Sequence, residues 1–165
     1  MLLKIWDINY FVVMEFGGVK MDRVKEAMGI FNGGFNCCQA VVAAFAQELG
    51  LDRETALKIS SGFGGGMRNA EICGAVSGAV MALGLKYGHF NEDDADSKEK
   101  IGERVKAFSS TFKEKHGSII CRELLGCDTS TEEGKEYAAE NELREKVCNG
   151  LIECAVELLE DMLKK

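Results

Sequence analysis

The stretch that decides the fold is residues 60–88, SSGFGGGMRNAEICGAVSGAVMALGLKYG. Residues 72–85 within it carry no charge and are too few to cross a bilayer as a helix, so they predict a helix buried in a protein core. Its small and apolar residues face every direction, as in a helix that other helices surround. Gly74, Gly78 and Ala82 recur every fourth residue, which lets neighbouring backbones approach closely. We therefore expect the rest of the chain to pack around this segment.

Amphipathic patterns and capping residues on both sides of this segment predict further helices. Asn36 and Asp52 are N-cap candidates upstream, and Asp96 with Glu99 forms a capping-box pattern downstream. Strand-like alternation is sparse, and the chain has no proline. We predict an all-α fold: a single-domain bundle of about six or seven helices around the buried central helix. Besides the helix after Asp52, the predicted helices cover residues 21–31, 37–49, 72–85, 97–115, 119–125 and 141–164.

Length, charge and cysteine content limit the class of protein. The 165 residues are enough for one domain with a substantial core. The net charge of −7 argues against a nucleic-acid or anionic-membrane surface, so no nucleic-acid or membrane partner is expected. Seven cysteines are an odd number for a secreted disulfide scaffold, and no cleavable signal peptide is expected. These features indicate a cytoplasmic protein whose thiols are reduced or held by metal.

The first twenty residues stand apart from the rest of the chain. They are apolar but interrupted by Lys4, Asp7 and Glu15. One interpretation is that translation starts at Met21, so that residues 1–20 are an extension and residues 21–165 form the domain. The alternative is a native arm that packs on the core or on a second subunit, which favours a homodimer.

Four of the cysteines are candidates for redox or metal chemistry. Cys37 and Cys73 lie in the first turns of predicted helices, where the helix dipole makes a thiol ionise more readily. Cys121 is near the start of a short helix, and Cys148 lies one position off the core stripe of the last helix. The other three cysteines are not candidates of the same kind. We expect Cys38 and Cys154 to be packing residues. Cys127 is expected to be an exposed thiol that either resolves a disulfide or has no role.

Common cofactor motifs do not occur in the sequence. There is no C-x-x-C pair, and without C-x-x-C-H we expect no covalent haem. His89 and His116 are isolated, so a mixed Cys/His zinc site is poorly supported. The glycine run is not a Walker loop, and its simplest interpretation is a tight connection between helices. The functional alternative is that the backbone N–H groups of Gly64, Gly65 and Gly66 bind an anion or a cluster sulfur.

Several segments together resemble one protein family. They are NCCQAV at 36–41, GFGGGM at 62–67, CGAVSGA at 73–79, CRELLG at 121–126 and Cys148. This series, over about residues 22–160, is similar to the C_GCAxxG_C_C family, whose members are described as redox-active and are related to the split-Soret cytochromes. The resemblance places the four family cysteines on Cys37, Cys73, Cys121 and Cys148. The family name has the order Gly-Cys-Ala, whereas this chain has Cys73-Gly74-Ala75, a shift of about 100° around a helix.

These observations lead to two functional hypotheses that share four converging cysteines. In the first, Cys37 or Cys73 is a low-pKa nucleophile, and another of the four resolves it as a disulfide. In the second, the same four thiolates hold an iron–sulfur cluster or another metal, and the protein exchanges electrons with a partner that the sequence does not identify. A third hypothesis, from a different class, is a non-enzymatic helical module with structural cysteines. The sequence does not choose a cofactor among these.

Overall fold

The computed structural model describes residues 22–164, and within them the chain forms eight α-helices and no β-strand. The all-α prediction is therefore confirmed. The α-helices are α1 (Arg23–Asn32), α2 (Cys37–Ala46), α3 (Arg53–Ser60), α4 (Gly74–Tyr87), α5 (Ala95–His116), α6 (Cys121–Leu125), α7 (Glu132–Glu140) and α8 (Asn149–Leu163). Three short helical turns lie between them: η1 (Ser61–Phe63), η2 (Gly66–Ala70) and η3 (Arg144–Cys148). The predictions about residues 1–20 lie outside the described residues.

The structure has more helices than the six or seven predicted. The sequence predicts only about one helical turn after residue 130, but α7 continues to Glu140, and the Thr131 hydroxyl caps it by accepting the N–H of Gly134 at 3.0 Å. The cap of α5 also differs, because the carboxylate of Asp94, not Asp96, accepts the N–H of Ser97 at 3.0 Å. The last predicted helix begins later than expected, since Glu142 adopts a left-handed φ of 54° before η3 and α8.

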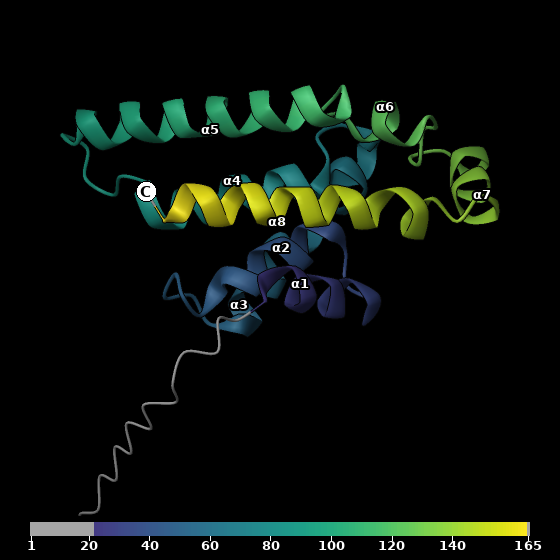
Figure 1. The fold of residues 1–165 in the computed structure, drawn as a ribbon, viewed down its shortest axis with the longest axis horizontal. Helices are drawn as coiled ribbons and strands as arrows, with labels where there is room; N and C mark the ends of the chain where they lie inside the picture. Colours follow the sequence, from purple (N-terminus) through teal and green to yellow (C-terminus); the bar gives the residue numbers. More distant parts are fainter. Residues whose placement is uncertain (1–21, 165) are drawn as a thin grey trace, which may run out of the picture.

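The helices form three levels in the view of Figure 1. α5 lies along one side, α4 and α8 lie in the middle, and α1, α2 and α3 lie on the other side, while α6 and α7 close one end. α4 packs against α2, α5 and α8. Half of its 14 residues are buried, including Ala75, Ala79, Ala82 and Leu83. None of the described helices combines the length and the apolar character needed to cross a membrane.

Small residues allow α2 and α4 to pack closely. A methyl group at position 78 would lie 3.0 Å from both the carbonyl oxygen of Cys38 and the Cβ of Val41, so any larger residue would push α2 and α4 apart by a few tenths of an ångström. The start of α2 is fixed by a capping box, in which Asn36 and Gln39 each accept the other's backbone N–H at 3.0 Å. The Asn36 amide also donates to the carbonyl of Ser61 at 2.9 Å, so the cap is tied to the end of α3.

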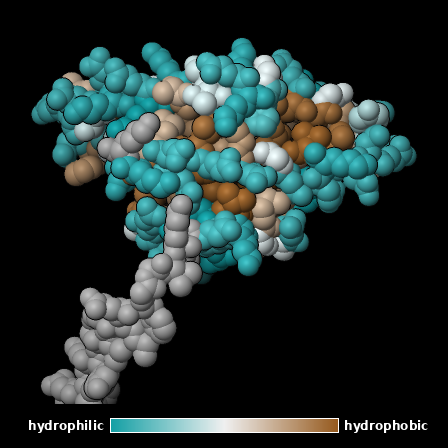
Figure 2. Space-filling view, viewed as in Figure 1, coloured by the Kyte–Doolittle hydropathy of each residue, from teal (hydrophilic) through white to brown (hydrophobic). Residues whose placement is uncertain are grey.

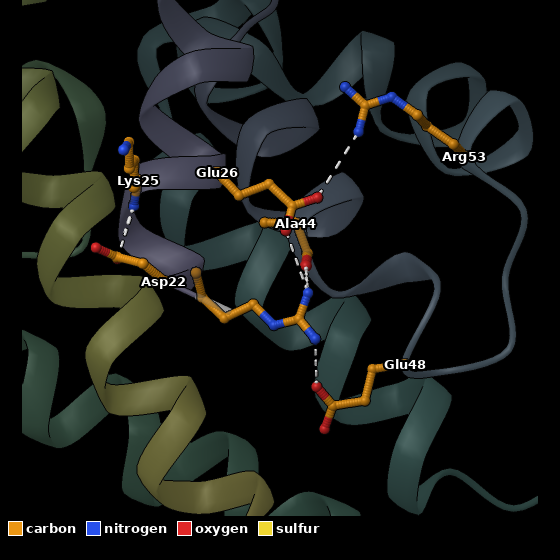
Figure 3. Close-up of polar contacts among 7 residues, drawn as sticks. Asp22, Lys25, Glu26, Ala44, Glu48 and Arg53 are labelled. Atoms are coloured by element: carbon orange, nitrogen blue, oxygen red, sulfur yellow. Dashed lines mark hydrogen bonds and ion pairs between the residues drawn. The ribbon is translucent and has the colours of Figure 1, made fainter. Parts of the chain in front are cut away.

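A polar network joins the first three helices on the side away from α5 (Figure 3). The Arg23 guanidinium, with a side chain only 12% exposed, donates to the Ala44 carbonyl at 2.6 Å and pairs with Glu48 at 2.8 Å. It also pairs with Glu26 at 3.2 Å, and Glu26 in turn lies 3.9 Å from Arg53. The network therefore links α1 to α2 and α3.

Candidate functional site

A cavity of about 530 Å³ lies where α2, the start of α4, α6, α7 and η3 meet. All four candidate cysteines line it: Cys37, Cys73, Cys121 and Cys148. Much of its remaining wall is apolar, from Phe31, Ala75, Leu124, Leu125, Ala138, Ala139, Leu143 and Leu151. Figure 2 shows a hydrophobic area between α6 and the first turns of α8, at this end of the molecule. Four thiols that are far apart in the sequence thus share one cavity.

Cys37 is the first residue of α2 and is half-buried. Its sulfur lies directly against Gly74, because a Cβ added to Gly74 would overlap the Cys37 Sγ. The same Cβ would come within 3.1 Å of the Cys38 nitrogen and of the Phe63 carbonyl oxygen. Any side chain at position 74 would displace the Cys37 sulfur, so the order Cys73-Gly74 fits the packing of this chain and the reverse order does not.

Cys73 and Cys121 are held together by a short antiparallel bridge. Ile72 pairs with Ile120, the N–H of Cys73 donates to the Ile119 carbonyl at 2.8 Å, and the N–H of Cys121 donates to the Glu71 carbonyl at 2.6 Å. Both side chains are buried, with 4% of Cys73 and 7% of Cys121 exposed. Cys73 is the N-cap of α4 and not a first-turn residue as predicted. The bridge fixes both backbones beside the cavity.

Cys148 ends η3, one residue before α8 begins. It is half-buried, and Arg144 four residues earlier fixes this turn. The Arg144 guanidinium donates to the carbonyls of Phe31 and Phe35 at 2.5 and 3.0 Å, and it lies 3.7 Å from the centre of the Phe31 ring. These contacts hold η3 against the connection between α1 and α2, next to the cavity that Cys148 lines.

Burial controls the ionisation of three of the four thiols. It raises the pKa of Cys73 strongly, that of Cys121 to about 11 and that of Cys148 to about 12. A negative charge on Cys37 would raise each of these pKa values further, so Cys37 lies within electrostatic reach of the other three sulfurs. The prediction that Cys73 ionises readily is therefore wrong. Backbone N–H groups of Ala75 and Val76 do lower its pKa, but loss of hydration outweighs them.

The other three cysteines do not line the cavity. Cys38 and Cys154 are buried in the core, as predicted, and the Cys38 thiol lies 3.9 Å from the Met81 sulfur. Cys127 is half-buried and not exposed as predicted; burial and the neighbouring Asp128 raise its pKa. All seven thiols are free.

The glycine run forms an unusual left-handed segment at the edge of the cavity. Gly65, Gly66, Met67 and Arg68 have consecutive φ values between 58° and 61°. Left-handed geometry costs about 1 kcal/mol for each non-glycine residue, so Met67 and Arg68 store strain here. Gly64 and Gly65 line the cavity, but Gly66 instead packs against Cys121, whose Cβ would lie 2.8 Å from a Cβ at position 66.

Arg68 is a cavity residue that the sequence analysis does not predict. No motif contains it, and its place depends on the left-handed segment, for which the sequence GGMR gives no signal beyond the two glycines. The remaining charged residues of the wall are Arg144 and Glu145. The cavity therefore combines thiols, apolar side chains and a few charges at its edge.

The cavity cysteines do not form a preformed metal site among the described residues. Among residues 22–164, no three Cys, His, Asp or Glu side chains lie where they could hold one metal ion together. The four thiols thus share a cavity without forming a ligand set.

Comparison with known families agrees with the cysteine pattern. Residues 35–162, most of the chain, match the sequence profile described as "Putative redox-active protein (C_GCAxxG_C_C)". The chain belongs to the C_GCAxxG_C_C family. The family description refers to redox activity, and the matched segment contains all four cavity cysteines. No curated protein and no solved structure matches the chain.

Proposed function

We propose that this C_GCAxxG_C_C protein is a dithiol redox protein in which Cys37 is the nucleophile and Cys73 is its first partner. The observation that carries the proposal is the contact between the Cys37 sulfur and Gly74, the residue next to Cys73. Cys121 and Cys148 line the same cavity and can receive the disulfide by exchange.

Cys37 is better suited to attack than the other three cavity thiols. It is the first residue of α2, whose start is fixed by a capping box, and its sulfur lies against the start of α4. It is half-buried, whereas Cys73 and Cys121 are buried. Cys148 is half-buried as well, but burial of its sulfur raises its pKa to about 12, so it keeps its proton, as Cys73 and Cys121 do. An attacking thiolate next to protonated partners is the arrangement that dithiol exchange requires.

The chemical step oxidises two thiols and reduces one disulfide. The Cys37 thiolate attacks one sulfur of an external disulfide, whose S–S bond breaks and whose other half leaves as a thiolate that takes up a proton. The Cys73 thiol then loses its proton and attacks the Cys37 sulfur of the mixed disulfide. The second half leaves as a thiol, and a Cys37–Cys73 disulfide remains. Two electrons have passed from the protein to the external disulfide, and the reverse sequence reduces the protein again.

The single-domain arrangement, the cellular compartment and the electron partner are part of the same proposal. Contacts of α8 with α1, α2, α4 and α5 support a single-domain bundle over residues 21–165. Seven free thiols fit a reducing compartment such as the cytoplasm. A dithiol that cycles there needs an electron partner, which we propose to be another thiol or disulfide.

Controlled oxidation of the purified protein tests this function. The reduced protein, prepared without oxygen, is treated with diamide, its free thiols are counted, and its disulfides are mapped by mass spectrometry. We expect the first oxidation to consume two thiols and to join Cys37 to Cys73. Cys37→Ser should abolish this fast step. Cys38→Ala is the matched control, since Cys38 is the neighbouring residue but does not line the cavity.

Two results would contradict the proposal. One is first oxidation at a cysteine outside the cavity, such as Cys127, with Cys37 and Cys73 still reduced. The other is iron or another metal bound stoichiometrically to the protein as isolated without oxygen, which would favour the metal hypothesis despite the observed geometry.

A further inference from the structure

Arg68 connects the thiol cavity to a second hollow. This smaller hollow, of about 350 Å³, is lined by Gly65, Arg68, Thr129, Ser130 and Lys135. Gly65, Arg68 and Thr129 also line the thiol cavity, so the two spaces adjoin along these residues. Arg68 is thus shared by the cavity that holds Cys37 and by the second hollow.

The charge around Arg68 suits an anion. Among residues 22–164, Arg68 makes no ion pair, although the chain has 27 Asp and Glu against 20 Lys and Arg. Lys135 adds a second positive charge to the hollow, although it also pairs with Glu132 at 2.6 Å. The carboxylate of Asp128 accepts hydrogen bonds from the N–H and the hydroxyl of Ser130, so Ser130 and not Arg68 is its hydrogen-bond partner.

The Arg68 side chain makes no hydrogen bond or ion pair with the described residues, and its backbone is left-handed. It ends the left-handed run that begins at Gly65 and has a φ of 61°. Its side chain is exposed, in contrast to Arg144, whose guanidinium is committed to two backbone carbonyls. Strain that places an exposed cation at the entrance of a cavity points to a role in binding.

From these observations we infer that the protein oxidises its thiols with small organic disulfides that carry a carboxylate, and that Arg68 binds this carboxylate. The inference rests on the proposed dithiol function. The cavity volume of about 530 Å³ lies in the range of small-molecule sites, and its walls at Leu124, Leu125 and Leu143 can contact a short apolar chain. A carboxylate on Arg68 then directs the disulfide bond of the ligand toward Cys37.

The reaction is the balanced exchange given above with the oxidant specified. One molecule of the carboxylate disulfide is reduced to two carboxylate thiols, and Cys37 and Cys73 become a disulfide. The ligand needs the charge only for binding, so a neutral disulfide of similar size should react by the same route without help from Arg68. Arg68 is therefore a substrate-binding residue and takes no part in the proton or electron transfer.

Rates of thiol oxidation with two disulfides test the inference. The probes are 3,3′-dithiodipropionate, which carries two carboxylates, and bis(2-hydroxyethyl) disulfide, which is neutral. Each rate is expressed relative to the wild-type rate with the same probe, so that intrinsic reactivity cancels. Arg68→Gln should slow the dicarboxylate about tenfold, because a charge-assisted hydrogen bond is lost, and should leave the neutral probe unchanged. Arg68→Lys should recover part of the loss.

A matched control separates direct binding of the carboxylate by Arg68 from general attraction between the protein and a negatively charged probe. Arg53→Gln removes the same charge from an exposed position on α3, and at physiological salt it should change neither rate by more than about twofold. Equal slowing of both probes by Arg68→Gln, or no slowing of either, would overturn the role of Arg68. If diamide forms the Cys37–Cys73 disulfide but the dicarboxylate does not, only the substrate assignment fails; if diamide also fails, the dithiol function itself is wrong.

Discussion

Replacing Gly74 with alanine should displace the Cys37 sulfur and slow disulfide formation. The added Cβ would overlap Sγ and would lie 3.1 Å from the Cys38 nitrogen and from the Phe63 carbonyl oxygen. The sulfur can turn away by rotation of its side chain, but the two backbone atoms cannot move without shifting α2 or η1. Overpacking of this kind costs about 1–3 kcal/mol, and the higher helix propensity of alanine returns less than about 1 kcal/mol at a helix start. We expect a net loss of about 1–2 kcal/mol in the free energy of unfolding.

Gly84 in the same helix is the matched control for this change. A Cβ at position 84 would meet nothing within 4 Å, so Gly84→Ala should stabilise the protein by about 0.5–1 kcal/mol. Urea denaturation of both variants in the reduced state gives the two free energies. The rate of Cys37–Cys73 disulfide formation with diamide should fall for Gly74→Ala and stay unchanged for Gly84→Ala. In a Cys37→Ala background, Gly74→Ala should cost less stability, because the clash with Sγ is gone.

One result would refute the reasoning about Gly74. If Gly74→Ala is as stable as Gly84→Ala and forms the Cys37–Cys73 disulfide at the wild-type rate, the sulfur does not lie against α4. The proposed pairing of Cys37 with Cys73 would then lose its main support.

Three further predictions concern the walls of the cavity. Arg144→Ala should destabilise the protein by about 2–3 kcal/mol in urea denaturation, because two hydrogen bonds and the stacking on Phe31 are lost, and Arg144→Lys should recover only part of this. Asn36→Ala should cost about 1–2 kcal/mol in the same assay, because it removes the capping box of α2. The free energy of unfolding should fall between about pH 9 and 11, because the unfolded chain releases the Cys121 proton near its ordinary pKa of 9.0, whereas folded Cys121 keeps it to about 11.

Each of these predictions has its own control. For pH, Cys121→Ala should show a smaller fall over the same range, and an identical profile would mean that Cys121 is not buried as described. Asp52→Ala at the start of α3 removes a cap far from the thiols, so it should lower stability without changing the oxidation rate, whereas Asn36→Ala should change both. Full recovery by Arg144→Lys would show that a positive charge alone, and not the planar guanidinium, holds η3.

Local features of the fold could be predicted from the sequence. Asn36 and Asp52 cap their helices as expected, because a cap depends on a side chain and a backbone N–H only three residues away. The apolar segment around Gly78 also forms a buried helix, because its composition suits no exposed position. The prediction that Asp96 caps α5 is wrong for a physical reason. Either Asp94 or Asp96 can accept a backbone N–H at the start of the helix, and the connection after α4 decides that Asp94 does so.

The arrangement of the site could be predicted only in part. The four cysteines were identified through their positions in the sequence, but whether their sulfurs share a cavity depends on tertiary packing. The left-handed segment at Arg68 and the burial of Cys73 have no local signal in the sequence. Both depend on tertiary packing, which for Cys73 includes the hydrogen bond of its N–H to Ile119, 46 residues away. Burial reversed the expected direction for the pKa of Cys73, since a helix N-terminus favours a thiolate only where the charge keeps some hydration.

The bridge between Ile72 and Ile120 has a consequence for the order of folding. It joins two ends of a long loop that contains all of α4 and α5, so the entropy of closing that loop must be overcome before Cys73 meets Cys121. We expect a contact with such wide sequence separation to form after the individual helices. In the newly made chain Cys37 has Cys38 as its nearest thiol, and only the folded protein offers it Cys73. With the proposed Cys37–Cys73 pairing, we expect oxidation before folding to join other cysteines and refolding under reducing conditions to give a higher yield of the correct pair.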